Sequence, residues 1–172
     1  DRCGVCVLQR AVESACLATV SVIVSAYLTP APTTAPYIPS HIAKQDLSRV
    51  LCVAAQHGYI GILQKLANII RLRFDVPLSD PAFHSALLAA CRENALHAVS
   101  ALLDMGVPVT HNCATQYDVH ADAYYTHERI AESHLAKSTQ SALAVAARHG
   151  HSKIVQLLMQ HGATDSAGTS HV

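Results

Sequence analysis

A segment of 23 residues, Ser141 to Ala163, recurs in weaker form along this chain. It reads SALAVAARHGHSKIVQLLMQHGA: a small-residue pair, a glycine three positions later, a group of aliphatic residues and a closing glycine. Weaker copies of the same pattern begin at residues 12, 51 and 87, and the clearest copy has the corresponding start at 143. A repeat of this kind predicts a stack of similar supersecondary units in place of a single globular core.

The four copies align on the small-residue pair and on the turn that follows it. The pairs are Ala15–Cys16, Ala54–Ala55, Ala90–Cys91 and Ala146–Ala147. The turn positions of the last three copies are Gly58, Asn94 and Gly150. The first copy is the faintest, and its second half supplies Ile23, Val24 and Tyr27. We expect the paired residues, Cys16 and Ala147 included, to be buried between neighbouring helices.

Within the last copy, local signals predict two short helices. Ser141 suits an N-cap, because its hydroxyl can accept a hydrogen bond from an unpaired N–H group of the first turn. Gly150 suits the break between the helices, since glycine enters a left-handed turn without steric cost. Gly162 then suits the end of the second helix. Helices this short are marginal alone, so stacking must supply the core.

The last copy resembles the ankyrin repeat over nearly its whole length. The matching residues are AA at 146–147, GH at 150–151, IV at 154–155, LL at 157–158 and GA at 162–163. The opening Thr-Pro-Leu-His of that family is missing, and the equivalents are SALA at 141–144, SALL at 85–88 and RVLC at 49–52. Intervals of 39, 36 and 56 residues between copies also exceed the family's 33. Another α-solenoid is the alternative.

The resemblance implies an all-α, ankyrin-like solenoid of about four degenerate helix-turn-helix repeats. We expect a single domain over residues 1–172. Its parts are four repeats at approximately 10–30, 48–72, 84–107 and 140–164, a proline-rich linker at 29–40 and a long insertion at 107–140 before the last repeat.

The apolar run at residues 15–28 has the composition of a helix, a membrane span or a buried strand. Its 14 residues are short for a membrane span, which needs about 20. The β-branched stretch VSVIV would also suit a buried strand, but the match to the later copies favours a helix. We therefore expect no membrane span. We expect Val20, Val22, Ile23 and Tyr27 of this copy to pack against a partner subunit instead of closing the stack.

Composition narrows the function classes. The chain is 51% hydrophobic and 14% charged, with 12 basic and 12 acidic residues. This balance gives no electrostatic case for nucleic acid or an anionic membrane. Cysteines at core positions of the repeat indicate a reducing, intracellular compartment, cytoplasm or organelle interior. The chain begins at Asp1, which we interpret as processing or as part of a longer product.

A metal- or redox-responsive module is the alternative function. CGVC at 3–6 has the spacing of a redox or half-zinc motif, but the sequence lacks the surrounding βαβ context or a second ligand pair. The insertion collects ligand-type residues without a closed motif: His111, Cys113, Asp118, His120, Asp122, His127, Glu128, Glu132 and His134. A solvated polar loop explains them equally, so we assign neither metal nor cofactor.

Catalytic motifs are missing from the sequence: there is no nucleophile elbow, phosphate-binding glycine loop or HExxH. We expect a non-catalytic protein–protein interaction module, a scaffold or accessory subunit that binds other protein subunits. A small-molecule substrate is not expected. The resemblance implies that contacts come from the two residues after each small pair. These are Gln56, His57, Arg92, Glu93, Arg148 and His149.

Overall fold

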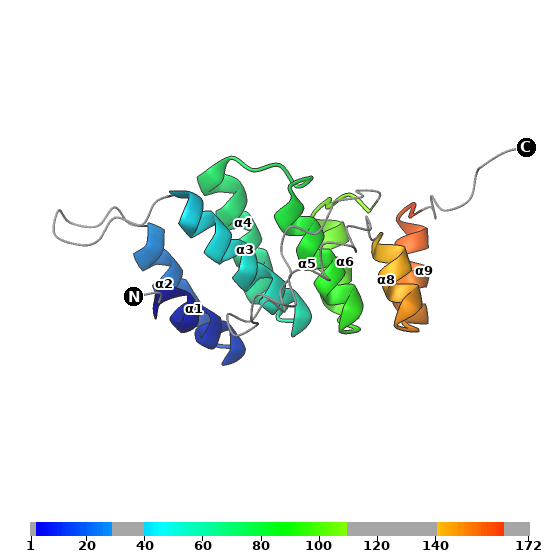
Figure 1. Ribbon diagram of the computed structural model, residues 1–172, viewed down its shortest axis with the longest axis horizontal. Helices are drawn as coiled ribbons and strands as arrows, with labels where there is room; N and C mark the ends of the chain where they lie inside the picture. Colours follow the sequence, from blue (N-terminus) through cyan, green and yellow to red (C-terminus); the bar gives the residue numbers. More distant parts are fainter. Residues whose placement is uncertain (1–2, 29–39, 110–140, 164–172) are drawn as a thin grey trace, which may run out of the picture.

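The computed structural model describes residues 3–28, 40–109 and 141–163. These residues form eight helices and no strand (Figure 1). The helices are α1 (Cys3–Glu13), α2 (Leu17–Leu28), α3 (Ser40–Gln56), α4 (Ile60–Phe74), α5 (Pro81–Arg92), α6 (Leu96–Asp104), α8 (Ala142–Arg148) and α9 (Ser152–Gln160). The predicted all-α repeat solenoid is confirmed.

Each pair of helices is closed by the same short turn. The turn residue has a positive φ in every pair: 70° at Gly58, 58° at Asn94 and 74° at Gly150. The next residue donates its N–H to the first residue of the small pair, as from Tyr59 to Ala54 at 3.0 Å. The equivalent bonds run from Ala95 to Ala90 at 3.0 Å and from His151 to Ala146 at 2.9 Å. The break predicted at Gly150 is therefore confirmed, and the same left-handed turn occurs at the equivalent positions of the two copies before it.

The first copy follows the same geometry, but not in the predicted register. Its left-handed residue is Ala15, with φ 55°, and Ala15 donates its N–H to Val12 at 2.8 Å. Ala11 and Val12 are thus the buried pair, at 5% and 0% exposure. The prediction that Cys16 is buried is wrong, because Cys16 lies in the turn and is exposed. The helical pair accordingly begins at Cys3, ahead of the expected start near residue 10.

The apolar run of the first copy is a helix, as expected. Val20 and Val24 are each 1% exposed, so Val20 belongs to the internal core and is not available to a partner. Val22, by contrast, is 68% exposed. No helix among the described residues has the length and apolar content needed to cross a membrane.

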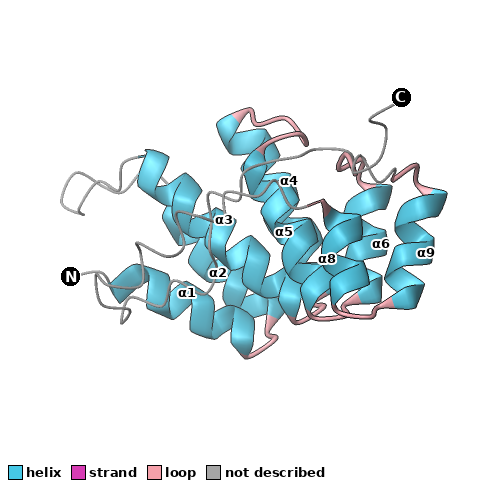
Figure 2. Cartoon of the chain, turned by 45° about the vertical axis from the view of Figure 1, so that its right-hand side comes forward, coloured by secondary structure: helices cyan, strands magenta, loops and turns pink. Residues whose placement is uncertain are grey.

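The pairs stack side by side along the chain (Figure 2). α3 packs against α1, α4 and α5, and α5 packs in turn against α6 and α8. The second helices form their own row, with α4 against α6 and α6 against α9. Alanine and cysteine at the pair positions permit this close approach: Ala54, Ala55, Ala90 and Cys91 are all 0% exposed. The hydrophobic core is therefore continuous from copy to copy.

The first helix of a pair does not begin at the same position of the repeat in every copy. In α8 the predicted N-cap is confirmed, since Ser141 Oγ accepts from the backbone N–H of Ala144 at 3.1 Å. In α5 the cap is Asp80, which accepts from Ala82 N–H at 2.9 Å, and Pro81 starts the helix. Ser85, the counterpart of Ser141, is therefore buried inside a helix, 4% exposed.

The prediction that Ala147 is buried is also wrong. Its counterparts Ala55 and Cys91 are fully buried, whereas Ala147 is exposed. The reason is position in the stack: among the described residues, no helical pair packs on the far side of α8 and α9. The proline-rich linker and nearly all of the insertion lie outside the described residues.

Candidate protein-interaction surface

The six predicted contact residues occupy equivalent places in three helical pairs. Gln56, Arg92 and Arg148 are the last residues of α3, α5 and α8, and each is followed by the next predicted residue. The following residues are His57, Glu93 and His149, and all three are exposed, as is Arg148; Gln56 and Arg92 are half-buried. We call these six residues the turn-edge row. The turns that they border lie along the lower edge of the molecule in Figure 1.

The structure brings half of this row into one groove. A groove of about 520 Å³ runs past the turns of the second and third copies and reaches the fourth. Gln56, His57 and Glu93 line it. Arg92, Arg148 and His149 are not part of its lining.

The groove also contains residues that sequence reasoning missed. His97 and Lys153 line it from the first turns of α6 and α9. In each pair the second helix starts at the same edge where the first helix ends, so its first residues face the same groove. The antiparallel pairing of helices was already implied by the repeat, and this signal could have identified both residues.

Positive charge predominates along this edge of the last three copies. The charged residues here are one carboxylate, Glu93, and three cations, Arg92, Arg148 and Lys153. Arg92 and Arg148 lie in the last turns of α5 and α8, where a cation interacts favourably with the partial negative charge of the helix C-terminus. The arrangement suits binding of a partner surface.

Histidines connect the edge to the stack behind it. His151 Nε2 lies 3.0 Å from the carbonyl oxygen of Arg92, which joins the fourth copy to the third. His149 stacks on His151, with ring centroids 5.9 Å apart, and His57 stacks on Tyr59 at 5.4 Å. His151 thus contacts two members of the row, Arg92 and His149. The row is therefore supported by packing across copies.

Burial separates Cys16, Cys52 and Cys91 into two kinds. Desolvation raises the pKa of both Cys52 and Cys91 to about 12, so these thiols stay protonated. At Cys16, hydrogen bonding from the Thr19 side chain and backbone lowers the thiol pKa. The Thr19 hydroxyl lies 3.0 Å from Cys16 Sγ. Cys52 and Cys91 thus behave as core residues, as expected.

The described residues contain no cluster of three or more metal-ligand side chains. The ligand-type residues of the insertion, from His111 to His134, lie outside the described part of the chain. Cys3 and Cys6 fall in the first turn of α1. The alternative metal or redox function therefore stays a prediction.

The fold and its edge groove define a class: an α-solenoid of helix-turn-helix repeats that presents a row of polar residues at its turns. A sequence model of ankyrin repeats in three copies matches residues 51–167. The chain belongs to the ankyrin-repeat family, whose repeats are protein–protein interaction modules. Comparisons with curated proteins and with solved structures found no significant match.

Proposed function

We propose that this protein is a non-catalytic scaffold or accessory subunit that binds a partner protein through the turn-edge row. The observation that carries the proposal is the set of six equivalent residues at the turns of three copies, three of which line a shared groove of about 520 Å³. A continuous edge of this kind suits an extended partner segment better than a small substrate, because its lining is spread over several turns.

The chemistry of the row supports a protein partner. Arginine is enriched at energetic centres of protein interfaces, because its guanidinium combines hydrogen-bond donors with a broad contact surface. Arg92 is half-buried and Arg148 is exposed, so both are open to a partner. The Arg92 backbone is already fixed by His151, which reduces the ordering cost of binding.

The test begins with affinity purification from the native source and identification of the proteins that co-purify. The double variant Arg92→Ala, Arg148→Ala should then weaken binding of the recovered partner tenfold or more, roughly 0.7 to 1 kcal/mol per arginine. Arg71→Ala is the control, since Arg71 is an exposed arginine of α4 that belongs neither to the turn-edge row nor to the groove.

Circular dichroism should show the same helix content in all three proteins, because neither row arginine is buried. Unchanged affinity of the folded double variant would remove the turn-edge row from the proposal. The alternative metal-responsive function has its own test: elemental analysis of purified protein, followed by loss of metal in a His120→Ala, His127→Ala variant.

A further inference from the structure

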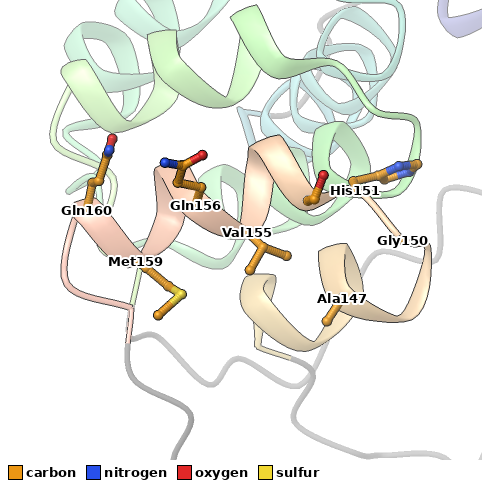
Figure 3. A pocket seen from close by; sticks show the side chains of 8 residues that line it. Ala147, Gly150, His151, Val155, Gln156, Met159 and Gln160 are labelled. Atoms are coloured by element: carbon orange, nitrogen blue, oxygen red, sulfur yellow. The ribbon is translucent and has the colours of Figure 1, made fainter.

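The last helical pair leaves an apolar face uncovered. A groove of about 660 Å³ lies along α8 and α9, and its lining includes Ala147, Val155 and Met159 (Figure 3). We call these three residues the end face. In Figure 3, Val155 and Met159 project from α9 on the side where Ala147 projects from α8. Their positions on α9 differ by four residues, which places them on one face of the helix.

The earlier copies show what this face is shaped to receive. The counterparts of Val155 are Leu63 and Val99, both 0% exposed, and those of Met159 are Ala67 and Leu103, at 0% and 6%. Met159 itself is 61% exposed. In the earlier copies the next pair supplies the cover, since α5 packs on α3, α6 on α4, α8 on α5 and α9 on α6. The same surface is therefore covered by helices wherever the stack continues.

Charge around the end face is of one sign. Residues 141–163 contain Arg148 and Lys153 and no aspartate or glutamate, although the whole chain is neutral. Arg148 follows Ala147 and Lys153 follows the groove residue Ser152, and both side chains are exposed. Neither cation lines the end-face groove, but each is the chain neighbour of a residue that does. A partner that covers the apolar centre therefore meets positive charge at the rim.

We propose that the end face binds an amphipathic helix of a partner protein, with small and aliphatic residues in its stripe and carboxylates along its flanks. The helical form follows from continuity with the repeat interface, which the end face extends by one copy. The acidic flanks follow from charge complementarity with Arg148 and Lys153. The apolar centre of this surface lies outside the groove of the turn-edge row, whereas Arg148 belongs to the row and Lys153 lines its groove. The two proposals therefore share these cations and are told apart at Met159, which lines the end-face groove alone.

Two other occupants fit the chemistry less well. A second copy packed about a twofold axis would bring Arg148 and Lys153 close to their own counterparts, and like charges oppose such contacts. The chain's last residues, 164–172, read TDSAGTSHV and contain one large aliphatic residue, Val172. That composition does not supply an apolar stripe.

The experiment uses the full chain and two synthetic helical peptides with the same alanine and leucine stripe, one flanked by glutamates and one by lysines. Fluorescence anisotropy should show binding of the glutamate peptide, with at least fivefold weaker binding of the lysine peptide. Met159→Gln should weaken glutamate-peptide binding about tenfold, or about 1.4 kcal/mol, since the ligand would bury the exposed part of the methionine side chain.

Leu72→Gln is the matched control, because Leu72 is 86% exposed on α4, far from the end face in sequence. It should leave peptide affinity unchanged. Thermal melts of both variants should match the parent, since each replaced side chain is exposed. Failure of the glutamate peptide to bind, or equal binding by the parent and Met159→Gln, overturns the proposal.

Three further outcomes would also overturn it. Equal binding of the two peptides would show that the ligand does not need carboxylates along its flanks. Binding to phosphatidylserine vesicles that is lost with Met159→Gln assigns the face to a membrane. A dimer in sedimentation equilibrium that dissociates with Met159→Gln assigns it to a second copy. None of these results decides the turn-edge row, because they use Met159 and synthetic probes, whereas the row is tested with the Arg92→Ala, Arg148→Ala variant and the natural partner.

Discussion

His151 Nε2 lies 3.0 Å from the carbonyl oxygen of Arg92, so one imidazole joins the last helical pair to the pair before it. His151 is the residue after the left-handed Gly150, and its own N–H bonds to Ala146 at 2.9 Å. The same residue thus closes the turn of the fourth copy and fixes the end of α5. This hydrogen bond adds to the hydrophobic contacts that Val145, Ile154 and Leu158 make in the core.

Replacing His151 by alanine should loosen the last pair. The lost hydrogen bond is worth about 1 kcal/mol of unfolding free energy. Hydrogen exchange followed by mass spectrometry should show faster exchange in α8 and α9, with little change in α3 and α4. His161→Ala is the control, since His161 is an exposed residue of the same copy. Equal exchange in the two variants would contradict the proposed anchoring role.

Asp80 has two roles that substitutions can separate. Its side chain caps α5 through Ala82 N–H and pairs with Lys44, with Oδ2 3.0 Å from Nζ. Asp80→Asn keeps a good cap and should cost less than about 1 kcal/mol, the range of a partly exposed ion pair. Asp80→Ala removes both and should cost about 1–2 kcal/mol. Urea unfolding measures the difference, and equal losses would show that the cap adds nothing.

The left-handed turn residues predict opposite effects of exchanging alanine and glycine. Ala15 has φ 55°, a conformation that costs an alanine about 1 kcal/mol or more. Ala15→Gly should therefore stabilise the first pair by roughly 0.5 kcal/mol, after the added chain entropy of glycine. Gly150→Ala should destabilise the last pair by about 1 kcal/mol.

Space does not complicate the Gly150 variant, since a Cβ built there meets nothing within 4 Å. Thermal unfolding of both variants would check the pair. A stabilising Gly150→Ala would show that strain at this turn is relieved elsewhere.

Thiol reactivity should divide the described cysteines. Cys16 is exposed, and hydrogen bonding from Thr19 lowers its thiol pKa. At a given pH, more of Cys16 is therefore thiolate than in a cysteine of ordinary pKa. Cys52 and Cys91 are buried, with pKa values raised to about 12. Iodoacetamide at pH 7.5 should modify Cys16 before Cys52 and Cys91, as located by peptide mass spectrometry. Cys52 and Cys91 should react only after unfolding in guanidinium; rapid labelling of either in the native protein would contradict their burial.

Replacing Thr19 by valine tests the cause of the lowered Cys16 pKa. The variant removes the side-chain hydrogen bond to Sγ, so the pKa should rise and labelling at pH 7.5 should slow. An unchanged rate would show that the backbone of α2 is sufficient.

Helix pairs and turns could be predicted because they depend on local chemistry. Ser141 and Gly150 were assigned as cap and turn, and the structure places them so. The first copy failed because its true pair, Ala11–Val12, lies four residues before the predicted Ala15–Cys16. A shift of about one helical turn preserves the apolar face, so periodicity could not detect the error. A left-handed alanine gives no sequence signal comparable to glycine.

By itself, the sequence determined the repeat and the helix pairs, and in the last three copies also the turn positions and the residues at the end of each first helix. These follow from spacing, glycine conformation and capping, which act within about twenty residues. Tertiary structure alone decided which apolar residues are covered. Ala55, Cys91 and Ala147 occupy the same place in the repeat, yet only Ala147 is exposed. Burial at that position depends on the next pair in the stack, which the pattern of a single copy does not encode.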